Sequence, residues 1–313
     1  MDSPTVTVIG NINIDLVIAS LSGLPEWGRD TIVSSMEFRT AGAAGYTAMA
    51  LSRIGVPVAL VTNMGDDLFG RRMLADLQGY PGIDLQGVEV TPGVPSGLSV
   101  SLVREDGERG FITYLGHLAH LEAGLIDRHW EKVAQARILL LCGYFVLPAL
   151  RGDATQLLLE RSRREGLLVL LDTGWDPVGW PSSSHREIRK LLPLVDVFLP
   201  NLEEARALTG ESQPSAMARR LIEEGLAQLV IKLGSQGCLA ADGQSMVYEP
   251  AYPVEIFDTT GAGDAFNAAF IYGLLAEWPL TRRLRFANRL AAHVIARRAQ
   301  AGERFPSLEE LEA

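Results

Sequence analysis

The segment Asp258–Phe270 has the sequence DTTGAGDAFNAAF. Two glycines that flank an alanine stand directly before an aspartate, and a run of small residues typical of a close-packed helix follows. Glycines permit a sharp turn with its N–H groups directed outward, and a helix start adds partial positive charge at the same place. The stretch therefore predicts a binding site for negative charge, with Asp264 in the first helical turn.

The residues alone leave two interpretations of Asp264 open. In the first interpretation, Asp264 serves only to stabilise the helix, because carboxylates are favoured at helix N-termini by about 0.3–1 kcal/mol. The alternative is phosphoryl transfer, which depends on positioning and electrostatic stabilisation. In that case backbone amides at 261–263 hold the γ-phosphoryl oxygens, and Asp264 accepts the proton of an acceptor hydroxyl. The helix dipole is expected to keep Asp264 ionised.

Along the rest of the chain, short apolar runs alternate with helical patterns. Apolar runs rich in Val, Ile and Leu are typical of buried parallel strands, and they occupy 5–10, 56–65, 136–145, 166–173, 196–201 and 227–234. Helical patterns occupy about 43–54, 67–77, 153–164, 202–208, 214–224, 264–275 and 283–298. This order predicts an α/β fold with a mostly parallel central sheet and helices on both faces.

Two regions, 29–41 and 97–116, depart from this pattern because their polar and apolar residues alternate. Such alternation is typical of half-exposed antiparallel strands. The second region contains REDGER (104–109), whose central Asp-Gly predicts a hairpin turn. A small sheet over the carboxyl ends of the main strands would act as a lid. We expect one domain, 1–313, with lid strands from about 12–41 and 97–116.

The composition narrows the class of partner. Lys and Arg number 28 against 38 Asp and Glu, a formal net charge of −10, so non-specific nucleic-acid binding is not expected. No apolar run reaches the ~18–20 residues of a membrane span, and the acidic start of the chain is unlike a signal peptide. We therefore expect no membrane partner and a cytoplasmic location. Cys142 and Cys238 lie in apolar runs and are predicted to be buried free thiols.

Several common motifs are absent from the sequence. A Walker A loop requires Gly-Lys-Ser/Thr, but none of Lys132, Lys190 and Lys232 follows a glycine. A dinucleotide fingerprint requires G-x-G-x-x-G, and in GAGDAF (261–266) Phe266 occupies the third small position. Neither G-x-S-x-G nor H-E-x-x-H occurs. The five histidines are scattered, which favours surface or core roles.

The segment DTTGAGD (258–264) resembles the C-terminal signature of the ribokinase-like PfkB family of carbohydrate kinases. Further segments resemble the family in the same order along nearly the whole chain: GNINIDL (10–16), AGAAGYTAMALSRIG (41–55), NMGDDLFG (63–70), PNLEEA (200–205), VIKLGSQG (230–237) and FANRLAAHVIAR (286–297). The resemblance implies a ribokinase-like fold with a small β-sheet lid. It also implies ATP-dependent phosphorylation of a hydroxyl on a sugar or sugar-like molecule.

The resemblance also implies roles for individual residues. Asp264 is then the catalytic base, and the anion hole comprises Gly261, Ala262 and Gly263. Asn201 and Glu204 lie near the nucleotide phosphates, and Glu204 places Mg²⁺ through water, as a single carboxylate often does. The other expected ATP-binding residues are Lys232, Gly234, Ser235, Gly237 and Asn288. In some members a monovalent cation lies beside the anion hole, on the segment matching 258–260, and the sequence leaves its presence here open.

The expected acceptor-binding residues are Asn13, Asp15, Gly42 and Tyr46. A carboxylate such as Asp15 suits a polyol because it accepts two hydroxyl donors. The family usually has Gly-Gly, then three further residues and then Asn, whereas this chain has Ala41 before Gly42 and Tyr46 in place of the Asn. Ribokinases proper also carry a substrate-binding glutamate that is missing around 142–144. These departures leave the acceptor undetermined and disfavour a plain ribokinase.

An ATP-dependent sugar kinase is thus the leading hypothesis, and two alternatives remain open. The first alternative is a nucleoside kinase of the same fold, in which Tyr46 would stack on the base of the acceptor. A non-catalytic sugar or nucleotide sensor is the second alternative, although a sensor needs neither Asp264 nor Glu204. Many kinases of the family dimerise through the lid, and the alternating lid segments are compatible with a homodimer.

Overall fold

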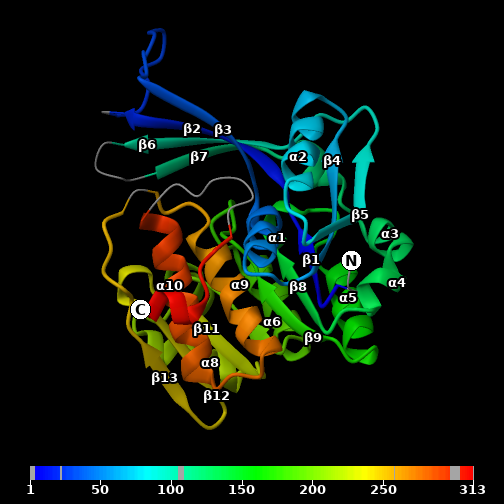
Figure 1. Ribbon diagram of the computed structural model, residues 1–313, viewed down its shortest axis with the longest axis vertical. Helices are drawn as coiled ribbons and strands as arrows, with labels where there is room; N and C mark the ends of the chain where they lie inside the picture. Colours follow the sequence, from blue (N-terminus) through cyan, green and yellow to red (C-terminus); the bar gives the residue numbers. More distant parts are fainter. Residues whose placement is uncertain (1–3, 22, 105–108, 257, 297–303, 313) are drawn as a thin grey trace.

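The computed structural model describes residues 4–21, 23–104, 109–256, 258–296 and 304–312. The chain forms a large sheet flanked by helices and a smaller sheet beside it (Figure 1). The Asp-Gly turn predicted within REDGER falls at 106–107, outside the described residues. Among the described residues, no helix is both long and apolar enough to cross a membrane.

The large sheet has the strand order β13-β12-β11-β10-β9-β8-β1-β4-β5. Its strands from β11 to β5 pair in parallel, and β12 and β13 add an antiparallel edge. The mostly parallel sheet predicted from the apolar runs is confirmed. The strands are β1 (Val6–Gly10), β4 (Val58–Gly65), β5 (Ile83–Thr91), β8 (Ile138–Cys142), β9 (Leu168–Asp172), β10 (Val197–Phe198), β11 (Gln228–Lys232), β12 (Cys238–Asp242) and β13 (Met246–Glu249).

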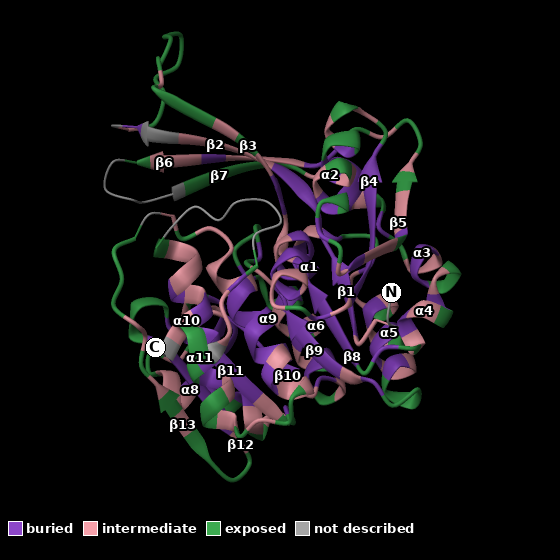
Figure 2. Cartoon of the chain, viewed as in Figure 1, coloured by how far each residue is buried: buried purple, intermediate pink, exposed green. Residues whose placement is uncertain are grey.

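Helices cover both faces of this sheet and enclose two apolar cores, shown as purple segments in Figure 2. One core is closed by α1 (Ala43–Arg53), α2 (Leu68–Gln78), α9 (Ala262–Leu275) and α10 (Leu280–Ala296). The other is closed by α3 (Ala123–Arg128), α4 (Trp130–Ala134), α5 (Asp153–Arg164), α6 (Ser182–Leu191), α7 (Leu202–Thr209) and α8 (Pro214–Glu223). The short helix α11 (Leu308–Glu312) lies near the C-terminus. Cys142 and Cys238 are buried free thiols, as predicted.

Several elements were not predicted because their local signals are weak. Helices α3 and α4 have only 6 and 5 residues, too few for a clear apolar period. Helix α6 begins with three serines, which favour caps and turns over helix interiors. Strands β12 and β13 are short, and the alanines of β12 resemble a helical sequence. In each case packing on the sheet, rather than local propensity, decides the structure.

The small sheet comprises β2 (Asn13–Leu21), β3 (Ser35–Ala41), β6 (Leu98–Arg104) and β7 (Arg109–Tyr114), in the order β3-β2-β6-β7. Its register aligns Arg39, Asp15, Ser99 and Thr113 across the four strands. Because directly paired residues share a face of a sheet, these polar side chains form one row. The next row, on the opposite face, is apolar: Phe38, Leu16, Val100 and Ile112. The small sheet, called the lid below, therefore has a polar and an apolar face.

The base of the lid is joined to the main fold by a buried histidine. The Gly97 N–H donates to Nδ1 of His117 (2.9 Å), and Nε2–H donates to the Ile12 carbonyl (2.9 Å). Burial lowers the pKa of His117 to about 4, so the ring stays neutral and keeps this donor and acceptor pattern. His117 is a structural residue, consistent with the core role favoured for the histidines.

Candidate active site

Polar side chains converge where the parallel strands of the main sheet end. Asp172 ends β9 and Lys232 ends β11, while the residues after β1 lead into the lid and those after β10 begin α7. The N-terminus of α9 lies over the same edge of the sheet (Figure 1). In open α/β sheets, ligands bind outside the carboxyl ends of the strands.

The turn before α9 is built around one glycine in a left-handed conformation. Gly261 is the N-cap residue, with φ of 77°, which glycine adopts without strain. Gly263 does not contribute to the turn as predicted, because it lies inside the first helical turn and has no positive φ. The Ala262 N–H donates to the Thr259 carbonyl at 3.3 Å. An anion bound here would therefore meet the later first-turn amides, which have no partner within a helix.

Asp264 has a higher pKa than the helix dipole predicts. Burial, followed by the charge of Asp172, raises the pKa of Asp264 to about 8, although Lys232 lowers it. The expectation that the dipole keeps Asp264 ionised is therefore wrong. The dipole stabilises a first-turn carboxylate by only about 0.3–1 kcal/mol, whereas the fold removes water from Asp264 and brings other carboxylates near it.

Asp264 lies beside a buried cluster formed by Asp172, Lys232 and Asn267. The Lys232 ammonium donates to Asp172 Oδ2 (2.7 Å) and to Asn267 Oδ1 (3.3 Å), and the Asn267 amide donates to Asp172 Oδ2 (2.6 Å). Although burial opposes the charge of Lys232, Asp172 and Glu204 raise its pKa. A Cβ atom placed on Gly263 would lie 3.6 Å from Lys232 Nζ. The Lys232 ammonium therefore lies next to the predicted anion hole.

Asp172 and Asn267 were missed from the sequence. The available signal was a carboxylate at the end of a buried strand and an amide three residues after Asp264 in a helix of small residues. That signal is weak, because many strands end in a polar residue.

Asn201 and Glu204 form a capping box at the start of α7. Asn201 Oδ1 accepts from the Glu204 N–H (2.9 Å), Glu204 Oε2 accepts from the Asn201 N–H (2.9 Å), and Oε1 accepts from the Asn201 side-chain amide (2.7 Å). Burial, followed by the charge of Asp172, raises the pKa of Glu204 to about 7. Each carboxylate oxygen keeps one lone pair, so Glu204 fits Mg²⁺ held through water.

The residues expected around the nucleotide have mixed surroundings. Gly234 and Ser235 lie on an exposed turn after β11, where Gly234 has φ of 60°. Gly237 has φ of 99°, and its Cβ would lie 2.2 Å from the Glu249 carbonyl, so strand packing requires glycine there. Asn288 donates its amide to the carbonyls of Glu249 (2.9 Å) and Pro250 (3.0 Å). It therefore holds the end of β13 against α10 and does not present a free donor.

A chain of hydrogen bonds joins Asn11, Asn13 and Asp15, on the side of the site where the acceptor is expected. Asn11 Nδ2 donates to Asn13 Oδ1 (3.1 Å), and Asn13 Nδ2 donates to Asp15 Oδ1 (2.8 Å). Burial raises the pKa of Asp15 to about 6, although Asn13 and Arg39 lower it. A Cβ on Gly143 would lie 1.9 Å from Asn11 Oδ1, and one on Gly42 would lie 2.4 Å from the Asn11 carbonyl. Asn11, which was missed from the sequence, therefore occupies the space beside both glycines.

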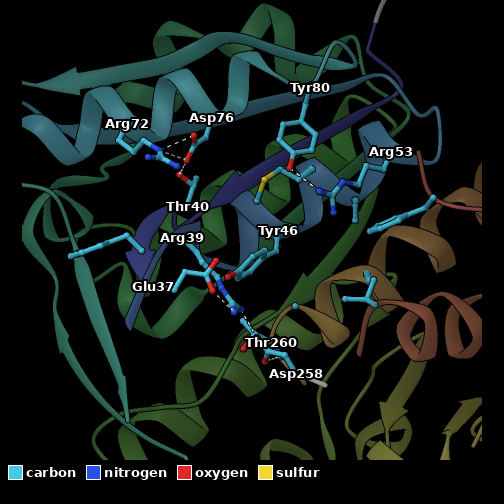
Figure 3. A pocket seen from close by; sticks show the side chains of 17 residues that line it. Glu37, Arg39, Thr40, Tyr46, Arg53, Arg72, Asp76, Tyr80, Asp258 and Thr260 are labelled. Carbon is cyan, nitrogen blue, oxygen red and sulfur yellow. Dashed lines mark hydrogen bonds and ion pairs between the residues drawn. The ribbon is translucent and has the colours of Figure 1, made fainter. Parts of the chain in front are cut away.

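Tyr46 lies between this acceptor side and a neighbouring pocket. Its ring packs 3.6 Å from the position of a Cβ on Gly261, and it lines a pocket of roughly 260 Å³ with Arg39 and Asp258 (Figure 3). Its hydroxyl is buried and has no hydrogen-bond partner among the described residues. Burial, followed by the charge of Asp15, raises the pKa of Tyr46, so the hydroxyl remains a donor.

Residues 3–304 match the sequence profile described as pfkB family carbohydrate kinase. The chain belongs to this family. It is 26% identical to a ribokinase of Haemophilus influenzae, with 98% of this chain and 96% of the relative covered. It is 25% identical to a deoxyribokinase of Salmonella typhi (97% and 96% covered), and 26% identical to a 5-dehydro-2-deoxygluconokinase of Geobacillus thermodenitrificans (87% and 82% covered).

Solved structures support the same placement in the PfkB family. A ribokinase of Thermotoga maritima has a TM-score of 0.80 at 25% identity, with 99% of this chain and 98% of the relative covered. A ribokinase of Arabidopsis thaliana, complexed with ribose and ATP, has a TM-score of 0.83 at 24% identity, with 99% and 98% covered. The predicted family and ribokinase-like fold are confirmed. As a PfkB carbohydrate kinase, the protein is a phosphotransferase that acts on the hydroxyl group of a sugar-like acceptor.

Neutralising Lys232 and neutralising Asp172 should shift the pH profile of turnover in opposite directions. Lys232→Met removes a cation that lowers the pKa of Asp264, so the acidic limb of kcat/KM should move up by about one pH unit. Asp172→Asn removes an anion that raises this pKa, so the limb should move down. Lys190→Met on α6 serves as the control and should leave the profile unchanged. Shifts of both variants in the same direction would contradict this electrostatic account.

Proposed function

We propose that the protein transfers the γ-phosphoryl group of Mg-ATP to a hydroxyl of a sugar-like polyol, with Asp264 as the general base. The observation that carries this proposal is the position of Asp264 at the start of α9, where the charges of Asp172, Lys232 and Asp15 all act on its pKa. One carboxylate thus lies between the nucleotide side and the acceptor side of the site. A reaction that draws on ATP also favours the cytoplasm as its location.

The raised pKa of Asp264 supports its role as a base. A general base is most effective when its pKa lies near the working pH, and burial places that of Asp264 at about 8. Asp264 would accept the proton of the acceptor hydroxyl as the hydroxyl oxygen attacks phosphorus. The amides that follow Gly261 and the ammonium of Lys232 would stabilise the charge on the transferred group.

The charges around Lys232 support a role for Mg²⁺. Asp172, Glu204 and Asp264 surround this one lysine, so the unliganded cluster carries more acidic than basic groups. Glu204 would hold Mg²⁺ through water, and the ion would supply positive charge to the phosphate oxygens. The same ion would favour the ionised forms of these carboxyl groups.

On the acceptor side we propose recognition by Asp15, Asn13 and Tyr46. Asp15 Oδ2 would accept acceptor hydroxyls beside Oδ1, which already accepts from Asn13. Tyr46 offers a buried hydroxyl donor and an aromatic face, so the acceptor would combine adjacent hydroxyls with a less polar face. The curated relatives named above act on ribose, deoxyribose and a keto-deoxy sugar acid. A nucleoside acceptor is the second candidate, and the Tyr46 ring is the observation that favours it.

We also propose that two copies of the chain associate through the apolar face of the lid. This face is partly covered by α2, since Phe38 stacks on Phe69 with ring centroids 5.7 Å apart but remains 43% exposed. Elsewhere on this face, Met36, Ile112 and Tyr114 are 57%, 65% and 56% exposed. A second lid offers the same apolar face, so a two-fold pairing would cover both surfaces at once.

The base is tested by Asp264→Asn. Loss of the base should lower kcat by ~10²–10⁴-fold with Mg-ATP, measured as ADP formation over a panel of sugars, sugar acids and nucleosides. Folding should be retained: ionised Asp264 is disfavoured in the folded state, so above neutral pH the variant should unfold at or above the wild-type temperature. Near-full activity of Asp264→Asn on its best acceptor would contradict the proposed mechanism.

Tyr46→Asn tests acceptor selection. The smaller amide restores the residue usual in the family and removes the ring beside Gly261. Activity should therefore shift toward simple pentoses and hexoses and away from the best wild-type acceptor, with KM for ATP changed less than about twofold. Unchanged relative kcat/KM values across the panel would show that Tyr46 does not select the acceptor.

The dimer is tested with two substitutions on neighbouring residues of β7. Ile112→Asp lies on the apolar face and should dissociate the dimer, as measured by sedimentation velocity. Phe111→Asp is the matched control, because Phe111 is similarly exposed (61%) but lies on the polar face. A monomeric wild-type protein, or dissociation caused equally by both substitutions, would contradict pairing through this face.

A further inference from the structure

Arg39 is an arginine of the lid that reaches the turn before α9. Its guanidinium forms ion pairs with Asp258 and with Glu37, the latter at 2.8 Å. The Arg39 and Asp258 side chains are only 23% and 18% exposed, so their attraction is less screened than that of a surface pair. Figure 3 shows Arg39 directed from β3 toward Asp258, past the Tyr46 ring.

Asp258 in turn shapes the segment that leads into the predicted anion hole. Its Oδ1 accepts from the Thr260 N–H at 2.9 Å, and its own N–H donates to the Ile295 carbonyl of α10 at 3.2 Å. Thr260 is followed by Gly261, the left-handed residue at which α9 begins. The direction of the first amides of α9 therefore depends on how the Asp258 carboxylate is held.

The partner that holds this carboxylate belongs to the acceptor-binding strands. Arg39 is paired directly with Asp15 in the register of the lid, and its charge lowers the pKa of Asp15. One guanidinium thus connects the strand pair that carries Asp15 with the turn that precedes Gly261. A displacement of β3 would separate Arg39 from Asp258.

We propose that Arg39 is a positioning residue that acts as the fixed counter-ion of Asp258, so that docking of the lid orders the anion hole without a diffusible monovalent cation. This inference rests on the role given under the proposed function to the amides that follow Gly261. A monovalent cation on Asp258 does not fit beside Arg39, because the guanidinium already neutralises this carboxylate and would repel a second cation at the same oxygen atoms.

The geometry suits arginine better than lysine. Two different nitrogens of the guanidinium engage Asp258 and Glu37, and this planar arrangement fixes the direction of the side chain. A lysine has a single charged nitrogen at the end of a flexible stem. Arg39→Lys should therefore keep the charge but hold the turn less firmly than wild type.

The test measures the response of wild type, Arg39→Met and Arg39→Lys to cations at constant ionic strength. For wild type, kcat should be the same in potassium and tetramethylammonium chloride. Arg39→Met should lose ~10- to 100-fold in kcat through misplacement of the anion hole. Millimolar guanidinium or potassium should restore part of this loss, and Arg39→Lys should lie between the other two. Arg72→Met is the control, since Arg72 lines the same pocket but pairs with Asp76 on α2.

A second readout does not depend on turnover. Potassium, compared with tetramethylammonium, should raise the unfolding temperature of Arg39→Met but not that of wild type, because only the variant offers a cation site at Asp258. An increase of the wild-type kcat by more than about twofold in potassium would overturn the proposal. An Arg39→Met variant whose kcat equals that of wild type would overturn it as well. So would an inactive Arg39→Met that responds to neither cation in either readout. If Asp264→Asn kept full activity, the proposed function would fail, whereas the thermal response would still test Arg39 as counter-ion.

Discussion

The buried charge of Lys232 is the interaction on which the rest of the site depends. Its ammonium is held by Asp172 at 2.7 Å, at the ends of two strands that flank β10 in the sheet. Buried charges are tolerated only when they are paired and hydrogen-bonded. Burial, followed by the charge of Asp172, raises the pKa values of Glu204 and Asp264, and the one cation of Lys232 only partly offsets this rise. The site is therefore acidic and suited to a cationic cofactor and a proton acceptor.

The lid and the main sheet contribute different things to the same reaction. The strand ends and α9 supply fixed charges and amides, while the lid supplies the Arg39 guanidinium and the Asp15 carboxylate, for which we propose a role in acceptor binding. Because Asp15 and Arg39 are paired on adjacent strands, the lid cannot present one to the site without the other. Asp15 and the counter-ion of Asp258 are therefore carried by the same pair of strands.

Site residues with a strong local signal were predicted from the sequence. Site residues that only the fold brings together from distant parts of the chain were missed. Gly261 and Asp264 were identified because a glycine turn and a helix start are adjacent in the chain. Asp172, Asn267 and Asn11 were missed because their importance arises from residues far away in sequence, such as the 95 positions between Asp172 and Asn267. The pKa of Asp264 was misjudged for the same reason, since the dipole is local and burial is not.

The histidine at the base of the lid, His117, keeps its hydrogen bonds to Gly97 and Ile12 over a wide range of pH. His117 titrates near 4, well below Asp15 at about 6, Glu204 at about 7 and Asp264 at about 8. Between pH 5 and pH 9 the joint at the base of the lid therefore keeps one protonation state while the reacting groups change theirs. A kinetic titration of this kinase over that interval therefore records no change in the protonation of His117.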